Sequence, residues 1–145
     1  MGSRINSEII SNSPEETVLA GKKIAALLEK GSVVALTGTL GSGKTNLVKG
    51  IAAGLGIDDN ITSPTYTIIN EYKIEKEDII FYHIDVYRLK GDSDFEDING
   101  PGIIGSDGIS VIEWSERIPG SLPENRITVN IEITGTTSRI IKITG

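Results

Sequence analysis

The sequence has no cysteine, and this absence excludes disulfide bridges, thiolate metal ligands and cysteine nucleophiles. It also has no apolar run that approaches the roughly 20 residues of a membrane-spanning helix. Basic residues are fewer than acidic ones, 14 against 20, and the formal net charge of −6 disfavours a broad contact with the phosphate backbone of a nucleic acid. We therefore expect a soluble protein without a membrane partner. Any role in nucleic-acid metabolism should run through a protein partner.

The length and composition are those of an ordinary globular domain. The 145 residues are 38% apolar and 23% charged, which is enough to bury a hydrophobic core without disulfides or structural metals. We expect one domain over residues 1–145, with residues 1–8 either disordered or left over from cloning. The first residues lack the apolar stretch of a secretory signal, which favours a cytoplasmic location.

The first half of the sequence alternates between helix and strand patterns. A capping box at residues 13–16 and the apolar spacing after it predict a helix near residues 14–29. Residues 32–37 form a short apolar run, which is typical of a strand covered on both faces. Apolar residues then recur at helical spacing over 47–55, and this spacing predicts a second helix that ends at Gly56.

The second half is dominated by strand patterns. Residues 66–74 and 78–87 alternate between apolar and polar positions, which predicts an antiparallel hairpin. Residues 109–113 predict a further strand, and the alternation over 127–133, followed by a turn and a last strand, predicts a second hairpin. The glycine-rich segment 100–108 is expected to be a loop.

A phosphate-binding loop is the strongest functional pattern. Residues 38–45 read Gly-Thr-Leu-Gly-Ser-Gly-Lys-Thr and match the P-loop, whose glycines turn backbone N–H groups toward phosphate oxygens. Lys44 is expected to contact the β- and γ-phosphates, and the hydroxyl of Thr45 to ligate Mg²⁺. The predicted strand before the loop and helix after it favour nucleotide binding over a chance match. The predicted nucleotide-binding residues of the loop are Leu40, Gly41, Ser42, Gly43, Lys44 and Thr45.

These patterns together predict the fold class. We expect a single α/β P-loop NTPase domain, with a mixed sheet that has a parallel core and antiparallel hairpins and is flanked by helices. The loop pattern alone fits ATP hydrolysis, phosphoryl transfer and simple nucleotide binding.

Two acids stand where a P-loop site needs a carboxylate for Mg²⁺. Asp85 and Glu113 each follow a short apolar strand pattern, so either could ligate the ion, directly or through water. For each acid alone, a solvated carboxylate at a strand end is the ordinary alternative. His83, the only histidine, shares a strand face with Asp85 and could hydrogen-bond beside the metal-binding acid, although a structural role is favoured.

The segment Thr62-Ser63-Pro64-Thr65 follows the P-loop helix. Its hydroxyl groups fit a switch segment near the γ-phosphate, with Ser63 and Thr65 as the candidate residues. A capped turn around Pro64 explains the same residues equally well.

Four elements in one order resemble a known family. They are Leu-Gly-Ser-Gly-Lys-Thr at 40–45, Ser-Pro-Thr-Tyr-Thr at 63–67, His-Ile-Asp-Val-Tyr-Arg-Leu at 83–89 and Ile-Glu-Trp at 112–114. Together they resemble the TsaE (YjeE) ATPases of tRNA threonylcarbamoyladenosine biosynthesis. The resemblance spans nearly the whole domain and implies an ATPase, with ATP and Mg²⁺ as cofactors.

The resemblance also implies partners. TsaE proteins work with TsaB and TsaD, so we expect contact with tRNA only indirectly, through that complex. By position, Thr45 and Glu113 match the family's Mg²⁺ ligands and Asp85 its Walker B-like acid, while Ser63 and Thr65 match its switch segment.

Other positions carry further implications. Trp114 resembles an aromatic residue near the nucleotide, and Thr17 resembles a threonine near the base. Thr39 stands where the family usually has Asp or Glu, and Ser42 where it usually has Ala. The segment 100–108 replaces what is commonly a short helix, so the surface that faces the partners is expected to differ.

The expected mechanism is mainly electrostatic. Lys44, Asp85 and Glu113 are the predicted catalytic residues, and no residue is an obvious base for the attacking water. We expect weak turnover alone and stimulation by partners. A small-molecule kinase is an alternative, although the arginines form no lid-like cluster, and a nucleotide-sensing module is another. A GTPase is disfavoured because no Asn-Lys-x-Asp element occurs.

Overall fold

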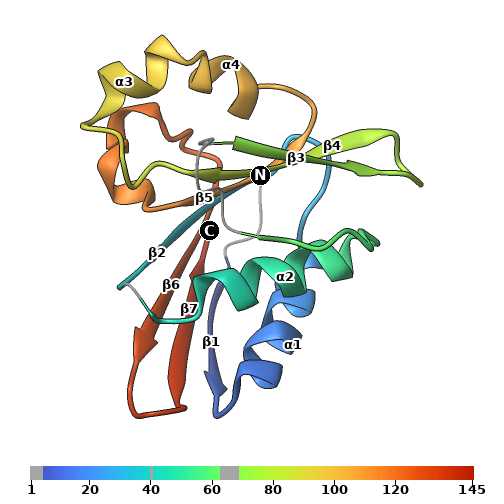
Figure 1. The fold of residues 1–145 in the computed structure, drawn as a ribbon, viewed down its shortest axis with the longest axis vertical. Helices are drawn as coiled ribbons and strands as arrows, with labels where there is room; N and C mark the ends of the chain where they lie inside the picture. The colour runs from blue at the N-terminus through green and yellow to red at the C-terminus, as the bar shows by residue number, and fades with distance from the viewer. Residues whose placement is uncertain (1–4, 40, 63–68) are drawn as a thin grey trace.

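The computed structural model describes residues 5–39, 41–62 and 69–145, and these form an α/β fold built on a seven-stranded sheet (Figure 1). The strands are β1 Asn6–Ser11, β2 Val33–Gly38, β3 Ile69–Ile74, β4 Ile79–Asp85, β5 Ile109–Glu113, β6 Ile127–Ile133 and β7 Arg139–Thr144. The helices are α1 Pro14–Ala25, α2 Lys44–Gly54, α3 Asp92–Asp97 and α4 Gly100–Ile104, with the short 3₁₀ turns η1 Ser115–Arg117 and η2 Pro119–Ser121. The strand order is β1-β7-β6-β2-β5-β4-β3.

The centre of the sheet is parallel and both sides are antiparallel. β2 pairs in parallel with β5 and β6, and β4 pairs in parallel with β5. β3 is antiparallel to β4, β7 to β6, and β1 to β7. The predicted mixed sheet with a parallel core and two antiparallel hairpins is therefore confirmed. Residues 66–68 of the first hairpin lie outside the described residues.

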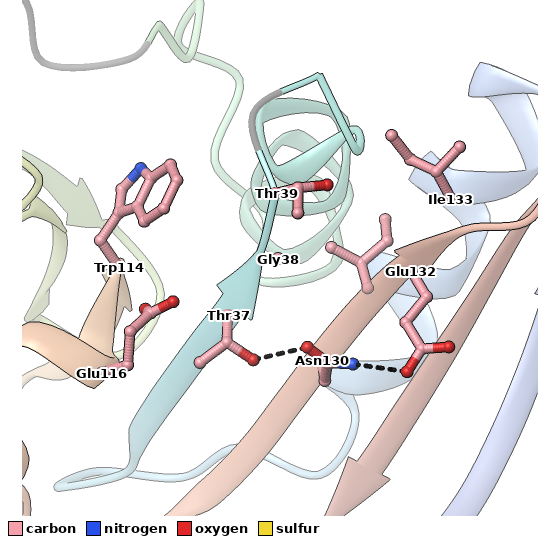
Figure 2. A pocket seen from close by; sticks show the side chains of 9 residues that line it. Thr37, Gly38, Thr39, Trp114, Glu116, Asn130, Glu132 and Ile133 are labelled. Atoms are coloured by element: carbon pink, nitrogen blue, oxygen red, sulfur yellow. Dashed lines mark hydrogen bonds between the residues drawn. The ribbon is translucent and has the colours of Figure 1, made fainter.

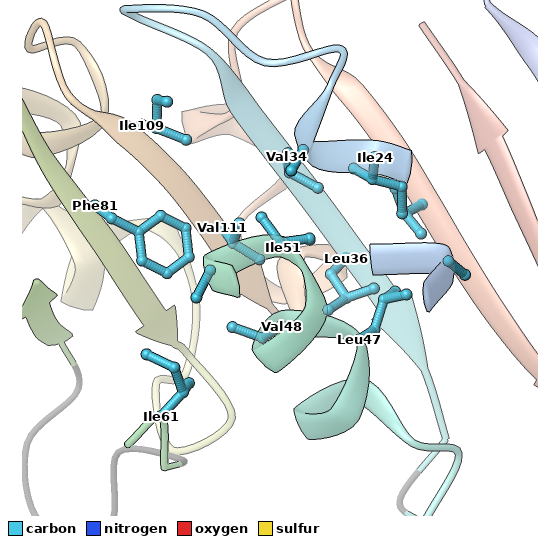
Figure 3. Close-up of a cluster of buried hydrophobic side chains, with 14 of the residues drawn as sticks. Ile24, Val34, Leu36, Leu47, Val48, Ile51, Ile61, Phe81, Ile109 and Val111 are labelled. Atoms are coloured by element: carbon cyan, nitrogen blue, oxygen red, sulfur yellow. The ribbon is translucent and has the colours of Figure 1, made fainter. Parts of the chain in front are cut away.

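α1 and α2 cover one face of the sheet, with the larger hydrophobic core beneath them (Figure 3). Val34 and Leu36 of β2 pack there against Leu47 and Ile51 of α2, and all four side chains are fully excluded from solvent. The two helices approach so closely at Gly50 that a β-carbon there would collide with the backbone of α1. This contact anchors α2, and with it the end of the P-loop.

The opposite face of the sheet carries a second core. Successive residues of a strand point to opposite faces, so Val33 and Ile112 lie on the face away from α1 and α2. They pack there with Phe95 of α3 and Ile104 of α4, both of which are buried. The sheet therefore has helices on both faces, as predicted. Among the described residues, no helix has the length and apolar character needed to span a membrane.

α1 begins as predicted but ends earlier. The Oγ of Ser13 accepts the N–H of Glu16 at 3.1 Å, which confirms the N-terminal cap. The helix ends at Ala25 and not near residue 29. The reason is that Leu27 and Leu28 donate to carbonyls three residues back, so the last turn tightens and the helix cannot continue.

Two other predictions differ from the structure. We expected residues 1–8 to be disordered or left over from cloning, but residues 6–8 are ordered in β1 and pair with β7. The predicted loop over 100–108 contains the helix α4. Pro101 occupies the first turn of α4, where a missing N–H does no harm, and the burial of Ile104 outweighs the weak helix preference of the glycines.

Candidate functional site

The carboxyl ends of the parallel strands meet at one edge of the sheet. β2 ends at Gly38, β4 at Asp85 and β5 at Glu113, and Asp85 lies directly opposite Glu113 in the parallel pair. In open α/β sheets this edge is the usual ligand site. The P-loop leaves β2 there and leads into α2, so the predicted order of strand, loop and helix is confirmed.

Two glycines of the loop have a left-handed backbone, which is a conformation found in anion-binding turns. Gly41 and Gly43 have φ angles of 79° and 102°, in the left-handed region, and Gly43 is the N-cap of α2. The N–H of Ser42 donates to the carbonyl of Thr39 at 3.1 Å, which closes a turn inside the loop. The positive end of the α2 dipole faces the same place, which favours an anion. Leu40 lies outside the described residues.

The ammonium group of Lys44 is held inside the site. Lys44 is 6% exposed, and its Nζ donates to the carbonyl of Gly38 at 2.6 Å. The same Nζ lies 3.5 Å from the ring centroid of Trp114, which is a cation–π distance. Burial lowers the pKa of Lys44, while the negative charges of Glu113 and, more weakly, Glu116 and Asp85 oppose this change. The site is thus a buried cation surrounded by acids.

The two predicted acids lie side by side at this cation. Glu113 is 3% exposed, and its Oε2 accepts a hydrogen bond from Nε2 of His83. The only histidine therefore supports Glu113, a partner that its shared strand face with Asp85 did not identify. Asp85 accepts the N–H of Tyr87 at 2.9 Å. Burial raises the pKa of Asp85, and the adjacent Glu113 adds to this, against the opposing effect of the Tyr87 N–H.

A pocket of about 400 Å³ joins these groups. Its lining includes Lys44, Thr45, Asp85, Glu113 and Trp114, so the structure brings the predicted catalytic and metal-binding residues together. Within the described ranges, no group of three or more His, Cys, Asp or Glu side chains gathers around one point. Nucleotide-bound Mg²⁺ needs only one or two carboxylates beside phosphates and water. Thr45 with Asp85 and Glu113 therefore fits such an ion.

Trp114 forms a wall of this pocket. It follows β5 directly and has a φ of 62°, an uncommon left-handed backbone for a bulky residue. Its ring lies 4.8 Å from the ring of Tyr87, and the guanidinium of Arg117 lies 4.9 Å from the Tyr87 ring centroid. Tyr87 and Arg117 therefore pack beside Trp114, and the sequence patterns did not predict these contacts.

A wider hollow of about 840 Å³ lies on the other side of Trp114. Figure 2 shows Trp114 and Glu116 on one side of this hollow, and Asn130, Glu132 and Ile133 on the other. The predicted catalytic and metal-binding residues line the pocket around Lys44 and not this hollow, whereas Trp114 lines both. We therefore assign the candidate site to the smaller pocket.

Thr17, for which the resemblance implies a place near the base, lies beside the P-loop. It is 3% exposed, and its Oγ1 lies 2.7 Å from the Oγ of Ser11. It lines a notch of about 80 Å³ together with Ser42 and Gly43 of the loop. The candidate switch residues Ser63 and Thr65 lie outside the described residues.

The fold and the site define an α/β protein with a P-loop, in which two strand-end carboxylates face a buried lysine. A model of the family described as "Threonylcarbamoyl adenosine biosynthesis protein TsaE" matches residues 11–141. The chain therefore belongs to the TsaE family, and the resemblance seen in its motifs is confirmed.

Individual relatives agree with this assignment. The tRNA threonylcarbamoyladenosine biosynthesis protein TsaE of Treponema pallidum is 42% identical over 134 residues, which cover 92% of this chain and 97% of the relative. The protein of the same name from Bacillus subtilis is 39% identical over 133 residues, covering 91% and 81%. The crystal structure of Bacillus subtilis YdiB has a TM-score of 0.75 at 33% identity and covers all of this chain and 88% of its own.

Proposed function

We propose that this protein is a Mg²⁺-dependent ATPase that supports threonylcarbamoyladenosine modification of tRNA in the cytoplasm. The observation that carries the proposal is the single pocket in which Lys44 of the P-loop faces Asp85 and Glu113. The names of the relatives, which place those proteins in tRNA threonylcarbamoyladenosine biosynthesis, supply the biological setting.

The residues of the pocket have separate roles in the binding and hydrolysis of ATP. The loop amides and the N-terminus of α2 bind the phosphates, and Lys44 exchanges its contact with Gly38 for the β- and γ-phosphates. Thr45, Asp85 and Glu113 hold Mg²⁺, which neutralises charge on the phosphates when it is bound. Trp114 covers the pocket, and Thr17 lies on the side of the base.

Partners complete the proposed function. No described side chain stands out as a base for the attacking water, so we infer weak hydrolysis by the protein alone. Stimulation comes from TsaB and TsaD, and contact with tRNA is indirect, through those proteins. The net charge of −6 agrees with this, because the chain repels the RNA backbone.

The test is phosphate release from ATP by the purified protein, with and without TsaB and TsaD. Lys44→Ala should reduce release at least 100-fold, because it removes the cation at the transferred phosphoryl group. Lys49→Ala is the matched control, since Lys49 is an exposed lysine of the same helix and should leave release unchanged.

Two results would contradict the proposal. Equal release by the Lys44→Ala variant would place hydrolysis elsewhere or in a contaminant. Binding of ATP without release, even with the partners, would favour a small-molecule kinase or a nucleotide-sensing module.

A further inference from the structure

Arg139 joins the P-loop to a distant hairpin. It is the first residue of β7, and its guanidinium donates to carbonyls on two segments. Nε donates to Ser42 at 2.8 Å and Nη2 to Gly41 at 3.3 Å, both in the P-loop. Nη1 donates to Gly135 at 3.1 Å and Ser138 at 2.9 Å, both in the turn between β6 and β7. Arg139 thus connects the hairpin with Ser42, which lies 97 positions earlier in the chain.

These contacts fix the direction of two peptide groups of the loop. In a planar trans peptide, the N–H points opposite to the carbonyl of the preceding residue. With the carbonyl of Ser42 held by Arg139, the N–H of Gly43 therefore points away from the guanidinium. With the carbonyl of Gly41 held, the N–H of Ser42 points back into the loop, where it meets the carbonyl of Thr39. A P-loop binds phosphate with its N–H groups, so the direction of these groups decides whether it can bind.

The hairpin does not depend on these contacts for its own shape. Thr134 donates to Ser138 across the turn at 3.0 Å, and Ile133 pairs with Arg139 in the β6–β7 ladder. Ladder pairing continues to Thr128 and Thr144. The two hydrogen bonds from Arg139 to the P-loop therefore constrain the loop, while the hairpin holds the guanidinium in place.

Arg139 also brings a charge to the back of the loop. Its guanidinium lies against the outside of the turn that would hold the phosphates, and it is half-buried, so solvent screens it only in part. A positive charge at this place favours a polyanion in the loop. A lysine could supply the charge but not the fork of donors, because an ammonium is a point donor and the guanidinium is a rigid plane.

We propose that Arg139 is a positioning residue of the nucleotide site, which holds the P-loop in its phosphate-binding form from outside. This inference rests on the proposed function, since it assigns the loop to phosphate. It predicts that a change at Arg139 alters the affinity for phosphates through its bonds to the carbonyl groups of the loop.

The test compares Arg139→Lys with Arg126→Lys. Arg126 is the matched control, because it also donates to a backbone carbonyl, that of Pro123, but away from the P-loop. The affinities for ADP and for pyrophosphate are measured by titration calorimetry, and thermal unfolding is followed for each variant. Arg139→Lys should weaken both ligands about tenfold, since two charge-assisted hydrogen bonds to the loop are lost. The Arg126→Lys variant should bind both as the unchanged protein does, at a similar unfolding temperature.

Equal binding by the two variants would overturn the inference. If Arg139→Lys does not fold, Arg139→Gln replaces it and the same weakening is expected. Failure of the unchanged protein to bind ADP would instead contradict the proposed function. In that case the role of Arg139 is tested by the amide NMR signals of Gly41, Ser42 and Gly43 in the protein without ligand. These signals should shift in the Arg139→Lys variant. Unshifted signals would overturn the role of Arg139.

Discussion

Asp85 and Glu113 stand opposite each other on neighbouring parallel strands, yet their surroundings differ. Glu113 is almost fully buried and is held by the side chain of His83, which is itself excluded from solvent. Asp85 is half-buried and is held by a backbone N–H. Of the three acids that raise the pKa of Lys44, namely Glu113, Glu116 and Asp85, Glu113 has the strongest effect.

The comparison teaches that the sheet places both carboxylates, while their neighbours decide what each can do. The buried side chain of His83 fixes the orientation of Glu113, as hydrogen-bond partners do for residues that ligate metal ions. Asp85 keeps more freedom to rotate and more contact with water. We therefore expect Glu113 to matter more for hydrolysis than Asp85, and the partner of Glu113 to matter for folding.

Replacement of His83 should have the largest effect on stability. His83→Ala leaves a buried carboxylate without its partner and opens a cavity, so the free energy of unfolding should fall by about 3 kcal/mol. Urea unfolding measures this. In a Glu113→Gln background, His83→Ala should lower the free energy of unfolding by less, because a neutral amide without a partner costs less to bury than a carboxylate. An equal loss in both backgrounds would show that His83 acts only through packing.

Replacement of Glu113 should have the largest effect on hydrolysis at unchanged fold. Glu113→Gln keeps an acceptor for His83 but removes the charge at Lys44 and Mg²⁺, so phosphate release should fall about 100-fold. Glu116→Gln is the control, since Glu116 is an exposed acid that also acts on Lys44. If phosphate release fell equally in both variants, the loss of negative charge near Lys44 would explain the effect, and the position of Glu113 would not.

Much of this site could be predicted because its signals are local. The P-loop is a contiguous pattern between a strand and a helix, and Asp85 and Glu113 each end an apolar strand, so parallel pairing was enough to bring them together. The hairpins followed from two-residue alternation in the same way.

The remaining features depend on contacts between distant residues. Alternation along β4 places His83 on a face but does not identify its partner on β5, which is Glu113. No local pattern connects Arg139 to the P-loop. The helix α4 was missed because its glycines indicate a loop, while the burial of Ile104 favours the helix.

The smallest expected effect concerns Asp85 and pH. Burial raises the pKa of Asp85 in the folded protein above its value in the unfolded chain, so ionisation favours unfolding. This penalty is present at neutral pH and is absent below about pH 3, where the carboxyl is protonated in both states. Asp85→Asn should therefore unfold at a slightly higher temperature than the unchanged protein at pH 7, without nucleotide or metal, and at the same temperature at pH 3. Thermal unfolding at the two pH values measures the difference. A lower unfolding temperature at pH 7 would mean that the ionised carboxylate stabilises the fold through its bond to Tyr87, and Asp85 would then resemble Glu113 more closely than its exposure indicates.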